Sequence, residues 1–109
     1  MASFGHFIKE EREKHGWTQT EFGAKICINA FAISKIENGS QKFSKTKLKE
    51  LAELLEMEFQ KVNDLFYADK FAVEAYKNHC SDNVFIVADS NVKYLQSTNA
   101  KQAKISFDQ

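Results

Sequence analysis

Apolar residues recur at helical spacing between residues 17 and 36, with one break in phase near residues 27 to 29. The repeating positions are Trp17, Phe22, Ile26, Ile28, Ile33 and Ile36. An amphipathic helix packs with its apolar stripe toward a core. The pattern therefore predicts two short helices that share one buried face and are joined by a tight turn.

Residues with capping side chains mark the ends of these two helices. Thr18 can cap the first helix, and Glu21 three residues later completes a capping box. Asn29 can cap the second helix. Asn38 and Gly39 can end it, because both residue types tolerate the left-handed backbone found at helix C-termini.

Three further helices are predicted around this pair. Ser3 can cap a first helix over residues 4–15, and Ser44 can cap a fourth over residues 45–56. A short fifth helix is expected to end near residue 66 and to close the bundle. The inner positions are Phe4, Phe7 and Ile8 in the first helix, Leu48, Leu51, Ala52 and Leu55 in the fourth, and Met57, Phe59, Val62, Leu65 and Phe66 in the fifth.

Two segments of the central stretch carry a family resemblance. Residues 18–26 read TQTEFGAKI and residues 33–39 read ISKIENG. The Cro/repressor (XRE) class of helix-turn-helix proteins commonly has S-Q-E-E-L-A-x-x-L followed by I-S-x-I-E-x-G, and the chain resembles it over roughly residues 4 to 66. The resemblance implies an all-α fold, a five-helix bundle whose third helix lies in the DNA major groove while the second crosses the backbone.

The resemblance also implies an ion pair between Arg12 and Glu37, which would tie the first helix to the DNA-reading helix. The alternative is that Arg12 is a solvated arginine within a charged helix exterior. Two positions depart from the family pattern: Gly23 stands where alanine is usual, and Cys27 replaces the usual turn glycine. A left-handed Cys27 would be strained by about 1–2 kcal/mol.

Candidate DNA contacts follow from the predicted helices. Five side chains can reach base edges: Asn29, Ala30, Phe31, Ser34 and Lys35. Phe31 either contacts a thymine methyl group or packs against a neighbouring subunit or helix, and the apolar character of Ala30 and Phe31 also leaves open a fold that has lost its DNA affinity. The expected phosphate contacts are Thr18, Gln19, Asn38, Ser40, Lys42, Lys45 and Lys47.

The charge distribution favours a nucleic-acid partner, although the net charge is zero. Residues 17–49 carry six lysines against two acids, whereas residues 50–69 carry one lysine against six acids. Phosphate binding depends on clustered basic residues, so the basic part of the bundle is expected to face DNA.

Residues 67–109 lie beyond the resemblance. The apolar pattern predicts two more helices within residues 67–97 and a polar tail over residues 98–109, disordered up to a short Ile-Ser-Phe segment. A protein that reads two half-sites must be a dimer, so this extension is expected to form a homodimer. Folding back on its own bundle is the alternative. The expected dimer contacts are Phe71, Tyr76, Val84, Val87, Val92 and Leu95.

No catalytic or metal-binding pattern is present in the sequence. His79 and Cys80 are the one neighbouring His–Cys pair, and two adjacent ligands cannot hold a metal alone. Neither an enzyme nor a cofactor is expected. With no apolar run long enough for a membrane span and no secretory leader, we expect a cytoplasmic protein of a bacterium or phage, associated with the nucleoid, whose two cysteines are reduced.

Two functions are consistent with these features. The first is a dimeric transcriptional regulator, a repressor or a controller of a restriction-modification operon, bound to a near-palindromic operator of double-stranded DNA. The second is an antitoxin-like protein that binds a second protein through its C-terminal segment.

Overall fold

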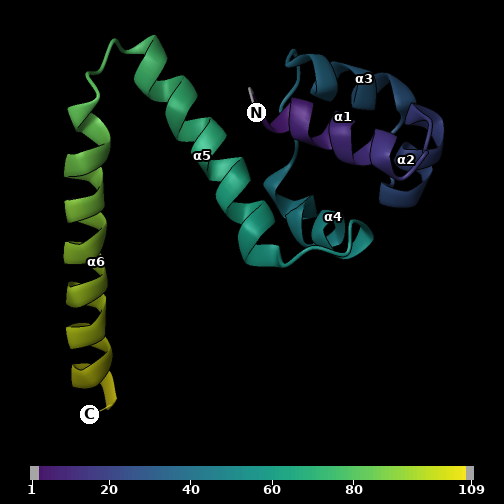
Figure 1. Ribbon diagram of the computed structural model, residues 1–109. Helices are drawn as coiled ribbons and strands as arrows, with labels where there is room; N and C mark the ends of the chain where they lie inside the picture. Colours follow the sequence, from purple (N-terminus) through teal and green to yellow (C-terminus); the bar gives the residue numbers. More distant parts are fainter. Residues whose placement is uncertain (1–2, 108–109) are drawn as a thin grey trace. The chain divides into compact units, whose positions relative to one another are not determined.

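The computed structural model describes residues 3–107, and side chains up to residue 99. The described part is all-α, with six α-helices and one 3₁₀ turn and no strand (Figure 1). The elements are α1 (Phe4–Lys14), α2 (Gln19–Ile26), α3 (Ala30–Asn38), the 3₁₀ turn η1 (Lys45–Lys47), α4 (Leu48–Leu54), α5 (Phe59–Lys77) and α6 (Asn83–Phe107). Two compact units are present, residues 1–71 and 72–109.

The predicted caps of the first three helices are confirmed. The Ser3 hydroxyl accepts a hydrogen bond from the His6 amide at 3.1 Å, and the Asn29 side chain accepts one from the Ala32 amide at 2.8 Å. Thr18 and Glu21 form the complete capping box, since each side chain bonds the backbone of the other. These bonds satisfy amides that have no partner within the first helical turn.

The capping box gives the start of α2 a sensitivity to acid. Hydrogen bonds from the Thr18 backbone and then from its hydroxyl lower the pKa of the Glu21 carboxyl. A depressed pKa means that the ionised carboxylate stabilises the fold above the pKa of the unfolded chain. This contribution is lost as the pH falls through the lower folded pKa.

The core lies in the first unit and contains the predicted inner faces of α1 to α4. Its buried side chains are Phe4, Phe7, Ile8, Phe22, Ile26, Ile33, Ile36, Phe43, Leu48, Leu51, Ala52, Leu55 and Val62. Trp17, Ile28 and Met57 are partly buried at its edge. The prediction for Phe59 was wrong, because this residue is 46% exposed at the first position of α5.

Phe43 is a core residue that the periodicity does not mark. It lies in the loop before η1, between polar neighbours, and its ring centroid is 5.8 Å from that of Phe4. A single buried residue in a loop produces no repeating pattern, so helical spacing carries no information about it.

The fourth helix begins differently from the prediction. Ser44 makes no capping bond to the backbone, and its hydroxyl instead pairs with that of Thr46 at 2.8 Å. Residues 45–47 form a 3₁₀ turn before the α-helix starts at Leu48. The tighter turn is a common way for an α-helix to begin.

The fifth helix does not end near residue 66, and this prediction was wrong. No glycine or proline occurs between residues 57 and 82, so nothing in the backbone interrupts α5 before Lys77. The helix is followed by Asn78, whose side-chain amide donates to the Glu74 backbone carbonyl at 2.9 Å, and by His79, which has the left-handed conformation.

The polar tail is also helical as far as it is described. α6 runs without a break to Phe107, through the position where the tail was expected to begin at residue 98. The expected disorder therefore does not apply to residues 98–107, and residues 108–109 lie outside the described part.

Candidate nucleic-acid interface

The turn after α2 folds back closely against Gly23. The Ile28 amide donates to the Gly23 carbonyl at 2.9 Å, and a Cβ atom on residue 23 would lie 2.2 Å from the Ile28 carbonyl oxygen. The alanine that is usual in the resembled pattern would not fit here without a shift of the backbone. Cys27 ends α2 with a φ of 59°, so it occupies the left-handed conformation expected at the turn.

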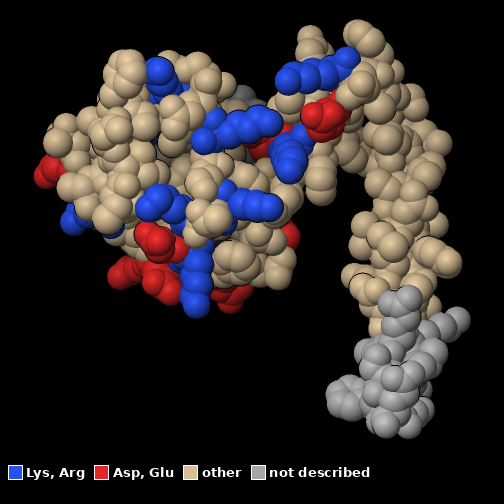
Figure 2. All heavy atoms as spheres, turned by 180° about the vertical axis from the view of Figure 1, so that it is seen from behind, with Lys and Arg blue, Asp and Glu red and all other residues tan. Residues whose placement is uncertain are grey.

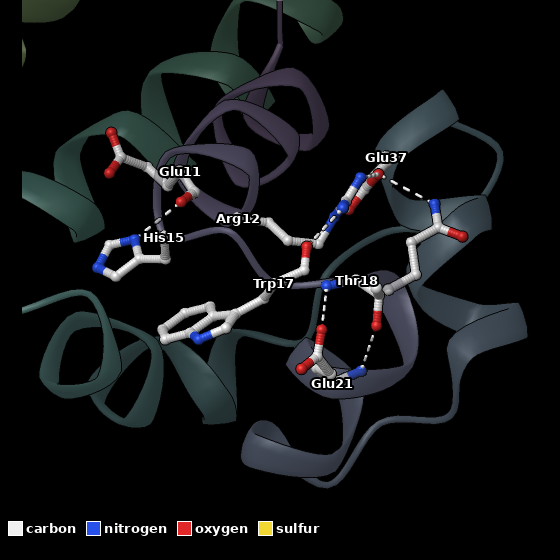
Figure 3. Close-up of polar contacts among 8 residues, drawn as sticks. Glu11, Arg12, His15, Trp17, Thr18, Glu21 and Glu37 are labelled. Atoms are coloured by element: carbon white, nitrogen blue, oxygen red, sulfur yellow. Dashed lines mark hydrogen bonds and ion pairs between the residues drawn. The ribbon is translucent and has the colours of Figure 1, made fainter.

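Arg12 of α1 and Glu37 of α3 form a nearly buried, two-pronged ion pair (Figure 3). The Arg12 Nε donates to Glu37 Oε2 at 2.6 Å, and Nη2 donates to Oε1 at 3.0 Å. The third guanidinium nitrogen donates to the Trp17 carbonyl at 2.9 Å. The two side chains are only 11% and 4% exposed, so this pair fixes the C-terminal end of α3 against α1 and the start of α2.

The Glu37 carboxylate also accepts a hydrogen bond from the Gln19 side-chain amide at 3.1 Å. The hydrogen bond to Glu37 raises the pKa of Arg12, so the guanidinium is charged throughout the pH range in which proteins fold. Gln19 is thereby held at the first position of α2. One of its two amide hydrogens is used by Glu37, and the other remains to donate to another group.

The five candidate base-reading residues lie along the first two turns of α3. Asn29, Phe31 and Lys35 are exposed, and Ala30 and Ser34 are partly exposed between them. The side-chain oxygen of Asn29 accepts the capping hydrogen bond, so the side-chain nitrogen is the group that remains to donate. Phe31 is 72% exposed, with the Lys35 Nζ 4.5 Å from its ring centroid.

Asn38 and Ser40 share one hydrogen-bonded arrangement after α3. The Ser40 amide and hydroxyl both donate to the Asn38 Oδ1, at 2.9 and 2.7 Å. Among the described residues nothing accepts from the Asn38 side-chain nitrogen, so this nitrogen keeps both of its hydrogens for another partner. The Ser40 hydroxyl has its hydrogen engaged.

The three candidate lysines beyond α3 differ in their environment. Lys42 and Lys45 are exposed. The Lys47 ammonium instead donates to the Ile26 carbonyl at 3.0 Å and lies 3.9 Å from the Glu50 carboxylate. Lys47 thus stabilises the C-terminal end of α2, where a positive charge is favourable, and is less available to DNA than the other two.

Basic side chains are spread over the face of the bundle seen in Figure 2, and acidic ones gather at its lower edge. The sequence itself has an excess of lysines in residues 17–49 and of acids in residues 50–69. A DNA-facing surface needs this separation of charge more than it needs a positive total.

A family model described as helix-turn-helix matches residues 8–62, half of the chain. The chain belongs to the XRE-type helix-turn-helix family. This is a family of DNA-binding transcription regulator domains and not of enzymes, and the match includes every candidate DNA contact named above. The helix-turn-helix unit of this protein is α2, the turn at residues 27–29, and α3.

Among solved structures, the chain is similar to a chain of the SinR protein/SinI protein complex. It is 20% identical, the alignment covers 86% of this chain and 98% of that one, and the TM-score is 0.49. No curated protein matches the chain.

The described residues meet neither the requirements of a metal site nor those of a membrane span. They contain no group of three His, Cys, Asp or Glu side chains placed to hold a metal ion. None of the described helices combines the length and the apolar character needed to cross a membrane.

The expected dimer contacts lie outside the helix-turn-helix bundle, on the second half of α5 and on α6. Tyr76 is 83% exposed, and Phe71, Val87, Val92 and Leu95 are about half exposed, while Val84 is partly buried. Figure 2 shows α6 as a largely uncharged column, and between residues 83 and 99 the only charged side chains are those of Asp89 and Lys93. These apolar side chains are available to another chain.

Replacing Cys27 with glycine is expected to stabilise the helix-turn-helix bundle by roughly 0.5–1 kcal/mol. Glycine avoids the strain of the left-handed backbone, which costs other residues about 1–2 kcal/mol. Its greater freedom in the unfolded chain offsets about 0.4–1 kcal/mol of this stabilisation. The exposed thiol contributes no packing. Urea unfolding followed by circular dichroism measures the change. Cys27→Ala is the matched control, and an equal gain from alanine would contradict the explanation.

Proposed function

We propose that this protein is a sequence-specific transcriptional regulator, a repressor or an operon controller, that acts in the cytoplasm as a homodimer on a near-palindromic operator. The observation that supports the proposal is the row of exposed side chains on α3. The C-terminal end of this helix is held by the Arg12–Glu37 pair. A reading helix must be rigid relative to its phosphate contacts, because direct readout depends on the register that those contacts set.

The roles of most contacts follow from the donors that each side chain has left. Gln19 at the start of α2, the side-chain amide of Asn38 and the exposed Lys42 and Lys45 would hold the phosphates, and Thr18 would lie beside them at the N-terminus of α2. Asn29, Ala30, Phe31, Ser34 and Lys35 would face the bases. Ser40 and Lys47 would hold neighbouring parts of the interface in place and would not bind DNA themselves, since their hydrogen-bonding groups are used within the protein.

Selection from a random duplex library with the purified full-length protein tests this function. At near-physiological salt, sequencing of the bound DNA is expected to return a motif with two related halves about one helical turn apart. Binding that is weak, sensitive to salt and without an enriched motif would contradict the proposal.

Replacing Lys42 with alanine is expected to weaken binding to all DNA sequences about equally and to lower the slope of log affinity against log salt by about one unit. The reason is that a lysine on a phosphate releases one counterion but carries no sequence information. Titrations of operator and unrelated DNA at several salt concentrations measure both effects. Ser34→Ala is the contrast, since it should alter the preferred sequence and leave the slope unchanged. A Lys42 variant with altered preference would contradict the assignment.

Introducing charge on α6 is expected to separate the homodimer. The double variant Val87→Asp, Val92→Asp would place two carboxylates in an apolar contact, where an unpaired charge is costly, and should yield a monomer with much weaker operator binding. Sedimentation measures the mass. Ser90→Asp adds a charge at another exposed position of the same helix and should remain dimeric. An unchanged mass of the double variant would show that α6 does not dimerise the protein.

A second candidate function is the binding of a different protein by the same apolar residues of α5 and α6. These apolar residues are numerous and exposed, and a helix of a different protein could cover them as well as a second copy of this chain could. Purified protein that sediments as a monomer, and that brings down one stoichiometric polypeptide from its native host, would support this function over the homodimer.

A further inference from the structure

Phe31 is the most exposed large apolar side chain among the described residues of the first unit. It lies in the first turn of α3, with the partly exposed Ala30 and Ser34 beside it. These two small residues leave the ring standing above the helix surface. A ring that is 72% exposed contributes little to the fold, so its role must be sought in a contact with another molecule.

Lys35 lies one helical turn after Phe31, and its ammonium is 4.5 Å from the centroid of the Phe31 ring. This is a cation–π contact between residues i and i+4. A lysine side chain ordinarily samples many rotamers, and a free lysine on a DNA-facing helix can reach the phosphates as a mobile point charge. The ring restricts these rotamers and keeps the ammonium above α3.

We propose that Phe31 and Lys35 act as one specificity element, the reading pair, which recognises a thymine and a guanine in neighbouring base pairs. The inference rests on the proposed function and deepens it. The Phe31 ring contacts the 5-methyl group of thymine, while the ammonium held over the ring donates to the O6 and N7 acceptors of guanine. Because Lys35 is already ordered by the ring, it loses less rotamer freedom when it binds the base.

The distinctive consequence is that Phe31 determines what Lys35 does. With the ring present, Lys35 reads a base. Without the ring, the lysine is free to move to the phosphates, and the guanine preference disappears together with the thymine preference. Two independent readers would behave differently, since each would lose only its own base.

The test compares motifs selected by three forms of the full-length protein: the wild type, Phe31→Ser and Lys35→Met. Phe31→Ser removes the ring and the apolar contact at an exposed position, and circular dichroism checks that it folds. The expected result is that Phe31→Ser loses both the thymine and the guanine from the motif, whereas Lys35→Met loses the guanine alone. The matched control Lys9→Met removes an exposed lysine of α1 outside the candidate interface and should retain both bases.

A chemical substitution in the DNA gives a second readout. Replacing the selected thymine with deoxyuridine removes only the methyl group, and this should weaken wild-type binding about fourfold while leaving Phe31→Ser binding unchanged. The reading pair is overturned if Phe31→Ser keeps the guanine preference or if deoxyuridine has no effect on the wild type. A wild type that enriches no motif at all would overturn the proposed function and the reading pair together, so the two failures are distinguishable.

Discussion

Replacing Arg12 with methionine is expected to lower the free energy of unfolding by about 3–5 kcal/mol. Methionine fills much of the same space, but it leaves the Glu37 carboxylate, which is 4% exposed, without the two hydrogen bonds of the guanidinium. The Gln19 amide alone cannot compensate a buried charge. Urea unfolding followed by circular dichroism and by the fluorescence of Trp17, the single tryptophan, measures the loss.

Two comparisons isolate the cause of this loss. Lys14→Met removes an exposed ion pair with Glu11, in which the lysine is 69% exposed, and should cost less than 1 kcal/mol. The double variant Arg12→Met, Glu37→Leu removes both buried charges and should recover much of the stability, because an apolar replacement of a buried pair is often neutral. A single Arg12 variant no less stable than the Lys14 variant would contradict the buried ion pair.

Replacing Gly5 with alanine is expected to destabilise the bundle by roughly 1–3 kcal/mol and to weaken operator binding. A Cβ atom at residue 5 would lie 2.1 Å from the Ile36 carbonyl oxygen, which belongs to the backbone of α3 and cannot rotate away. The two helices would have to move apart to relieve this contact. Alanine gains about 1 kcal/mol of helix propensity over glycine, which does not offset overpacking of this extent.

The effect on DNA binding distinguishes displacement of α3 from general loss of stability. Gly16→Ala is the control, because residue 16 has a φ of +73° but nothing within 4 Å of an added Cβ atom. It should cost about 1–2 kcal/mol in backbone strain and leave operator affinity unchanged at a temperature where the protein is folded. If Gly5→Ala bound DNA as well as Gly16→Ala, α3 would not have moved.

The bundle was predictable from the sequence because its signals are local. The spacing from Trp17 to Ile36 and the caps at Ser3, Thr18 and Asn29 depend only on residues within a few turns of each other. The family motif then indicated the long-range Arg12–Glu37 contact, which no local pattern contains. Phe43 was missed for the opposite reason, since it reaches the core from a loop.

The extent of α5 and the roles within the interface could not be predicted in the same way. The end of the family motif near residue 66 is not a helix breaker, and the uninterrupted propensity of residues 67–77 carries α5 onward. The engagement of Lys47 by the Ile26 carbonyl depends on the placement of α2 beside η1, which three-dimensional packing decides. From the sequence, Lys42, Lys45 and Lys47 were equally good candidates for a phosphate contact.

The exposure of α6 makes the C-terminal unit responsive to protein concentration. A helix that buries almost none of its apolar side chains is only marginally stable in water, and its population rises with the concentration of whatever covers it. If two copies cover each other, the amount of competent regulator grows faster than the amount of protein made. Operator occupancy then has a threshold in expression level, set by the strength of the contact between the two C-terminal units and not by the affinity of α3 for its bases.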